Sequence, residues 1–130
     1  MTNELIVNVN PMGKPRMSRA DRWKKRPCVL RYFAYSNIIK EVMLLQNFQP
    51  ANELIMTFYV MMPKSWSKKK KAEMVGTPMQ SKADIDNIVK GVLDSLLKKD
   101  ETVWKICASK RWAFSGQIIV KNWEKDISIK

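Results

Sequence analysis

The alternation of hydrophobic and polar positions along the chain predicts four strands and three helices. Runs of β-branched and aromatic residues are typical of strands, and apolar residues spaced three and four apart are typical of helices. The predicted strands are residues 5–10, 53–62, 103–114 and 117–124. The predicted helices are residues 32–48, 65–75 and 84–98, with Ser36 or Asn37 capping the first.

The order of these elements, β-α-β-α-α-β-β, predicts a single α/β (α+β) domain over residues 1–130. Such an order is typical of a mixed sheet with helices packed on one face. The first strand alternates like an edge strand, and the second is apolar enough to be buried. Residues 11–31 contain three prolines and a glycine, so we expect a loop or arm there. We expect residues 125–130 to form a loose tail.

The charge of the chain is strongly positive and unevenly distributed. The 24 basic and 12 acidic residues give a formal net charge of +12, which points to a polyanionic partner and above all to nucleic acid. Residues 84–101 depart from this pattern, because five of the acidic residues lie there. Carboxylates packed together repel one another and also repel a polyanion. A divalent cation would relieve both effects, since it neutralises the acids and attracts phosphate.

The rest of the composition narrows the possible chemistry. The chain has no histidine, which excludes serine–histidine triads, cysteine–histidine pairs and nucleases with a histidine base. Its two cysteines, Cys28 and Cys107, cannot form a four-ligand zinc site and are expected to be reduced thiols. A hydrolase of this composition would depend on carboxylates and a metal ion. With no signal peptide and no apolar run of about 20 residues, we expect a cytoplasmic protein without membrane contact or a small-molecule cofactor.

The predicted helix over residues 84–98 carries the candidate chemistry. Its apolar residues form one continuous arc that must face the core. Asp86, Lys90 and Asp94 form an i, i+4, i+8 row along the flank of that arc, and Asp86 falls inside its edge. Asp84 and Asp86 lie near the N-terminus of the helix, where its dipole and free amides favour anions. A purely structural interpretation also fits, with Asp84 as an N-cap and Lys90 in surface ion pairs.

This segment resembles the RusA family of Holliday junction resolvases, small endonucleases that are often carried by prophages. The family core D-x-D-N-x-x-K is matched by Asp84, Asp86, Asn87 and Lys90, and an aspartate shortly before the next strand is matched by Asp100. The segments PMGKPR, after the first predicted strand, and MPKSWSKKK, at the end of the second, resemble the phage branch of the same family. The resemblance extends over nearly the whole chain.

The resemblance implies a homodimer of α/β fold that makes paired nicks in four-way junctions with Mg²⁺, for which Mn²⁺ substitutes. It implies that Asp84, Asp86 and Asp100 bind the metal ion and carry catalysis, with Lys90 also required. Glu101 is the alternative to Asp100 as the third acid. Under this hypothesis, water activated by the metal attacks the phosphorus, and Lys90 stabilises the transition state or orients the water.

Basic residues of two segments are the candidates for holding DNA through its phosphates. They are Lys14, Arg16, Arg19, Arg22, Lys24, Lys25 and Arg26 in the arm, and Lys68, Lys69, Lys70 and Lys71 in the second predicted helix. A solvated face is the alternative interpretation of such runs. Among the tryptophans, Trp66 beside the lysine run is the best candidate for stacking on a base. Trp104 and Trp112 are expected to pack in the core or in a dimer interface.

Two other functions remain open from the residues alone. The chain could be a metal-dependent nuclease that acts on other branched DNA. It could also be a non-catalytic DNA-binding module, in which the acids are only caps and surface pairs. Mg²⁺-dependent nicking of a labelled junction separates the nuclease from the module.

Overall fold

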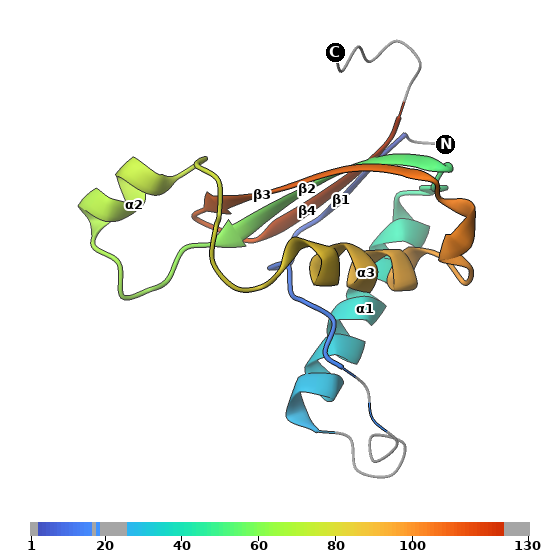
Figure 1. The fold of residues 1–130 in the computed structure, drawn as a ribbon, viewed down its shortest axis with the longest axis horizontal. Helices are drawn as coiled ribbons and strands as arrows, with labels where there is room; N and C mark the ends of the chain where they lie inside the picture. Colours follow the sequence, from blue (N-terminus) through green and yellow to red (C-terminus); the bar gives the residue numbers. More distant parts are fainter. Residues whose placement is uncertain (1–2, 17, 19–25, 124–130) are drawn as a thin grey trace.

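The computed structural model describes residues 3–16, 18 and 26–123 (Figure 1). It confirms the predicted order β-α-β-α-α-β-β. The strands are β1 (Glu4–Val7), β2 (Glu53–Met61), β3 (Lys105–Ala113) and β4 (Gln117–Asn122). The helices are α1 (Pro27–Leu45), α2 (Lys68–Met74) and α3 (Ile85–Leu96). A short 3₁₀ turn, η2 (Asp100–Thr102), lies between α3 and β3 and was not predicted.

The four strands form one mixed sheet with the order β1-β4-β2-β3. β4 pairs antiparallel with both β1 and β2, whereas β2 and β3 are parallel. β1 is an edge strand and β2 lies inside the sheet, as predicted. The parallel pair requires a crossover, and the chain makes it through α2 and α3. This crossover carries the segment with the candidate catalytic residues.

The core lies between one face of the sheet and two helices. Figure 1 shows α1 and α3 on the same side of the sheet, with α2 beyond its end. Alternate residues of β2, among them Leu54, Met56 and Phe58, are buried and face these helices, as the period of a strand requires. Ile88 and Val92 of α3 pack into the same cluster. The predicted mixed sheet with helices on one face is therefore confirmed.

Helix α1 begins earlier than the pattern predicted. Pro27 occupies its first position, which suits proline because the missing N–H would have no partner there. The prediction of Ser36 or Asn37 as the cap is wrong: both lie inside the helix, and the residue at the cap position is Arg26. The predicted arm is correspondingly shorter. Four of its proposed DNA-binding residues, Arg19, Arg22, Lys24 and Lys25, lie outside the described residues.

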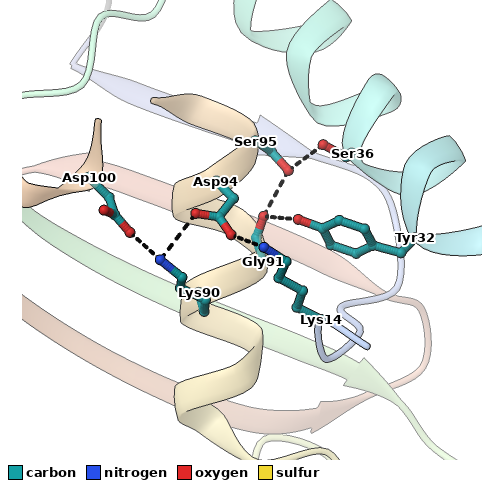
Figure 2. Close-up of polar contacts among 8 residues, drawn as sticks. All are labelled: Lys14, Tyr32, Ser36, Lys90, Gly91, Asp94, Ser95 and Asp100. Atoms are coloured by element: carbon teal, nitrogen blue, oxygen red, sulfur yellow. Dashed lines mark hydrogen bonds and ion pairs between the residues drawn. The ribbon is translucent and has the colours of Figure 1, made fainter. Parts of the chain in front are cut away.

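A small buried polar network fixes α1 to the middle of α3 (Figure 2). The Tyr32 hydroxyl donates to the Gly91 carbonyl over 3.1 Å, and the Ser95 hydroxyl donates to the same oxygen over 2.8 Å. Ser36 and Ser95 hydroxyls lie 2.7 Å apart. A β carbon at Gly91 would come within 3.2 Å of the Tyr32 ring, so the close approach of the two helices depends on this glycine.

A second cluster of apolar side chains lies under α2 and changes the interpretation of the tryptophans. Trp112 is buried in it, as predicted for the core. Trp66 packs edge-on against Trp112, with ring centroids 4.9 Å apart, and Lys70 covers its ring at 4.2 Å. The structure thus gives Trp66 a packing role. Trp104 is 71% exposed in the single chain and so does not pack in the core, whereas its packing in a dimer interface stays a prediction.

Candidate active site

Helix α3 presents its polar residues in the predicted arrangement. Ile88, Val92 and Leu96 are buried against the core. Asp86 and Lys90 are exposed on the flank, and Asp94 is half-buried. The expectation that Asp86 falls inside the apolar edge is therefore wrong, because its side chain reaches solvent. No desolvation cost is needed to explain its presence.

The side chains of Asp84 and Asp86 have no hydrogen-bond or ion-pair partner in the described part of the chain. Asp84 occupies the N-cap position with an extended backbone, but its side chain makes no capping hydrogen bond. Lys90, one turn from Asp86, makes its ion pairs with other residues. Of the structural interpretation, the cap at Asp84 and an Asp86–Lys90 pair are not formed among the described residues, whereas the surface pair of Lys90 with Asp94 is confirmed. Both carboxylates are left exposed and available to a ligand.

The acids that follow along α3 are paired with lysines in a continuous chain (Figure 2). Lys90 Nζ donates to Asp100 Oδ2 over 2.6 Å and lies 3.3 Å from Asp94 Oδ1. The other oxygen of Asp94 accepts a hydrogen bond from Lys14 Nζ. The order Asp100–Lys90–Asp94–Lys14 therefore alternates negative and positive groups across the flank of α3. It joins the loop after β1 to the turn before β3.

The Lys90–Asp100 pair shifts the ionisation of both groups. The hydrogen bond to Asp100, and after it that to Asp94, raises the pKa of Lys90 above the ordinary lysine range. The same hydrogen bond lowers the pKa of Asp100. The stability that this pair contributes through Lys90 is lost only when the pH rises through the raised pKa of Lys90. The stability that it contributes through Asp100 is lost only when the pH falls through the lowered pKa of Asp100. Across the neutral range Lys90 is therefore a cation and not a general base.

The position of Asp100 bears on which acid completes the site. The 3₁₀ turn η2 brings its carboxylate back to Lys90, in the middle of α3. Glu101, the alternative third acid, is exposed and has no partner in the described part of the chain. The geometry therefore favours Asp100 over Glu101.

The comparison with known families agrees with this geometry. The family model "Endodeoxyribonuclease RusA" matches residues 8–121, nearly the whole chain. The chain belongs to the RusA family. It is therefore an endodeoxyribonuclease by family, and branched DNA is the partner that this membership supports. No curated protein and no solved structure shows a significant match to the chain.

The donor chemistry of this RusA-family site suits a divalent metal ion. Mg²⁺ is commonly bound through one or two carboxylates, with phosphate and water completing its shell. The exposed carboxylates of Asp84 and Asp86 supply such a pair. Within the described residues, no three acidic or cysteine side chains form a group able to hold a metal. Joint metal binding by Asp84, Asp86 and Asp100 stays a prediction, because Asp100 is engaged by Lys90.

The proposed DNA-binding residues that the structure describes lie on two surfaces of the RusA-family domain. Lys14 and Arg16 line a pocket of about 390 Å³ on the flank of α3, together with Lys90. The Arg26 guanidinium donates to the Arg16 carbonyl over 2.6 Å. The lysines of residues 68–71 lie on α2, beyond the end of the sheet, and three of the four are exposed. Among the described residues, no helix is long and apolar enough to span a bilayer.

The sequence analysis missed one residue that supports the start of α3. Lys110 Nζ donates to the carbonyls of Ser81 and Ala83, over 2.8 and 2.7 Å. It thereby holds the loop that leads directly into Asp84. Lys110 pairs with the buried Phe58 and so occupies a position on the core-facing side of β3. A lysine at such a position in a predicted strand was the available signal.

Proposed function

We propose that this chain is a divalent-metal-dependent endonuclease that resolves Holliday junctions by paired nicks. The observation that carries the proposal is the pair of exposed carboxylates, Asp84 and Asp86, which no described residue pairs with, beside a chain of lysine–aspartate pairs in a RusA-family domain. Two acids without partners among the described residues, in a chain of net charge +12, are best explained by a cation ligand.

Each residue of the site has a distinct part in the proposed reaction. Asp84 and Asp86 bind the metal ion, which, when bound, activates water and stabilises negative charge on the phosphate oxygens. Lys90 is 53% exposed and stays cationic, so it can donate to the phosphate as charge develops. Asp100 holds Lys90 in place and becomes available as a third ligand if that lysine turns to the phosphate.

The basic surfaces suit the branched DNA substrate that we propose. Residues 68–71 on α2 place exposed lysines at one end of the molecule, and Lys14 and Arg16 lie beside α3. Lysine and arginine contacts to phosphate give affinity without sequence preference. Recognition of a junction would then depend on the spacing of these surfaces around the site.

We also propose that the enzyme acts as a homodimer joined through the outer face of α1. Leu30, Phe33, Ile38, Leu44 and Leu45 are 42–85% exposed, although they belong to a single helix. Large apolar side chains that are exposed together on one helix mark a candidate protein–protein interface. Figure 1 shows the N-terminal half of α1 extending beyond the sheet, where a second copy can reach it. A two-fold dimer would place two sites in matching relation on a four-way junction.

Sedimentation velocity tests the dimer. The wild-type protein should sediment as a dimer, and Leu44→Glu should give a monomer because it buries a charge in the apolar interface. Phe114→Glu changes another exposed apolar residue, 63% exposed, on the β3–β4 turn and should remain a dimer. A monomeric wild type, or a dimeric Leu44→Glu variant, would contradict this interface.

The function is tested with a four-way junction labelled on each strand in turn. In Mg²⁺ or Mn²⁺ the protein should nick two opposing strands, and EDTA should abolish nicking while leaving the complex intact. Linear duplex of the same sequence is the control substrate. Binding without metal-dependent nicking would favour the non-catalytic DNA-binding module. Nicking of forks and flaps as fast as of junctions would favour a general nuclease of branched DNA.

A further inference from the structure

The loop after β1 is attached to α3 by two contacts of different kinds. The Lys14 amide donates to the Asn87 carbonyl over 3.2 Å, and the Lys14 side chain pairs with Asp94. The loop lies directly against the helix, since a β carbon at Gly91 would be in ordinary van der Waals contact with Lys14 Cβ, at 3.5 Å. The aromatic ring of Tyr32 also lies 5.9 Å from Lys14 Nζ. The loop is therefore held on the flank of the helix.

This attachment creates a pocket of positive charge beside the proposed metal ligands. Its volume is about 390 Å³, and it is lined by Lys14, Pro15, Arg16, Asn87 and Lys90. Three of these residues are cations and none is an acid. Asn87 immediately follows Asp86 on α3, so the pocket adjoins the site where we propose cleavage.

Asp94 connects the two lysines of this pocket. One of its oxygens accepts from Lys14 and the other lies 3.3 Å from Lys90 Nζ. Two ammonium groups held this close would otherwise repel each other. Asp94 is half-buried, with a side chain 25% exposed, so it is less screened than an exposed acid.

The lysines keep donors free for a further ligand. An ammonium has three N–H donors. In the described residues Lys14 uses one on Asp94, and Lys90 uses two on Asp94 and Asp100. The Arg16 guanidinium has no partner in the described part of the chain, and arginine binds phosphate through two parallel hydrogen bonds. The pocket therefore offers several unused donors to one anion.

We propose that this pocket binds a backbone phosphate of the DNA next to the one that is cleaved, and that Asp94 is the positioning residue that holds Lys14 and Lys90 at its wall. The inference rests on the proposed function for the identity of the ligand as DNA. It adds a phosphate subsite and a role for Asp94, which is predicted to touch neither the metal ion nor the DNA.

Binding of a labelled four-way junction in EDTA tests the pocket without requiring cleavage. Arg16→Ala and Lys14→Ala should each weaken binding about tenfold and flatten the log–log salt dependence by about 0.9, the amount expected for one lost phosphate contact. Arg16 lies in an exposed loop, so its replacement leaves the core intact. Unchanged affinity and an unchanged salt slope for both variants would overturn the proposed subsite.

The role of Asp94 is tested by combining it with Lys14 in a double-mutant cycle. In an Asp94→Asn background, Lys14→Ala should cost less than about threefold in affinity, because Lys14 is no longer held in place. In a Glu4→Gln background the cost should stay about tenfold. Glu4 pairs with Lys121 on the other edge of the sheet, at 3.2 Å, and so provides a matched control. The same cost in all backgrounds would show that Asp94 does not position Lys14.

Two further measurements keep the outcomes distinct. Asp94→Glu keeps the charge and should restore most of the coupling, which a loss of folding in Asp94→Asn would not predict. If wild-type protein fails to nick but the pocket variants still weaken binding, the proposed function fails and the subsite stands. If wild-type protein nicks and the pocket variants bind normally, the subsite fails and the function stands.

Discussion

Aspartates lie at both ends of α3, but those at its start are unpaired among the described residues and those further along are paired with lysines. At the start of the helix, Asp84 and Asp86 are exposed and have no partner in the described residues. Further along, Asp94 accepts from one lysine and pairs with a second, and the turn after the helix adds the Lys90–Asp100 pair. This segment thus contains two carboxylates that no described residue pairs with and two that hold lysine side chains.

This difference separates carboxylates that are available to bind a ligand from carboxylates that hold neighbouring lysine side chains in position. A carboxylate already paired with lysine gains less from a metal ion than an unpaired one, because its charge is already compensated. A lysine between two acids is fixed in position and stays protonated. The two halves of α3 are therefore expected to respond differently to loss of charge.

The largest expected effect is at the unpaired acids. Asp84→Asn and Asp86→Asn should each reduce nicking more than about 100-fold, beyond what is typical for residues outside the metal ligands. Removal of a negative charge near phosphate should leave junction binding in EDTA equal or tighter. Stability should change by less than about 0.5 kcal/mol, since both side chains are exposed and unpaired. Gel assays of nicking and binding, with thermal unfolding, measure all three.

If both asparagine variants retained nicking, the proposal that Asp84 and Asp86 bind the metal ion would be wrong. A large loss of stability in these variants would instead support the structural role that the sequence left open for the two acids.

A smaller effect is expected at the paired end, where Asp100 and Glu101 can be compared directly. Asp100→Asn should reduce nicking about 10- to 100-fold, because Lys90 loses its closest partner. Glu101→Gln should stay within about twofold, since that side chain is exposed and touches neither lysine nor aspartate in the described residues. Single-turnover nicking rates at saturating enzyme make the comparison. A larger loss for Glu101→Gln would reverse the assignment of the third acid.

The smallest expected effect concerns two tyrosines of α1 that repeat the contrast between partnered and unpartnered groups. The Tyr32 hydroxyl donates to Gly91, whereas the buried Tyr35 hydroxyl has no partner among the described residues. Burial raises the pKa of both hydroxyls, so both stay protonated. Tyr32→Phe should lower the free energy of unfolding by about 1 kcal/mol, and Tyr35→Phe should be neutral or stabilising. Urea unfolding curves with equal slopes would give both values.

Equal losses in the two variants would mean that the Tyr35 hydroxyl stabilises the fold as much as the Tyr32 hydroxyl that is bonded to Gly91. A Tyr32→Phe variant more stable than the wild type would show that this polar network does not stabilise the contact between α1 and α3.

Much of the fold was predictable because its signals are local. The apolar, β-branched run of β2 predicted a buried strand and the apolar arc of α3 predicted a core-facing helix, and both predictions are confirmed. The start of α1 was not predicted, because the pattern of apolar residues outweighed the simpler signal of Pro27 at the first position of a helix. Trp104 was assigned to the core or a dimer interface on residue type, and residue type did not reveal that its side chain is exposed in the single chain.

For the site, the sequence by itself determined which residues are the candidates for the chemistry. The absence of histidine, the acidic segment in a basic chain and the spacing of Asp84, Asp86 and Lys90 all follow from composition and helical period. Only the tertiary structure decided which acids are paired. Lys14 and Asp94 are 80 residues apart, and the turn that returns Asp100 to Lys90 follows from how the crossover packs. Contacts between distant segments depend on packing, and no local pattern encodes them.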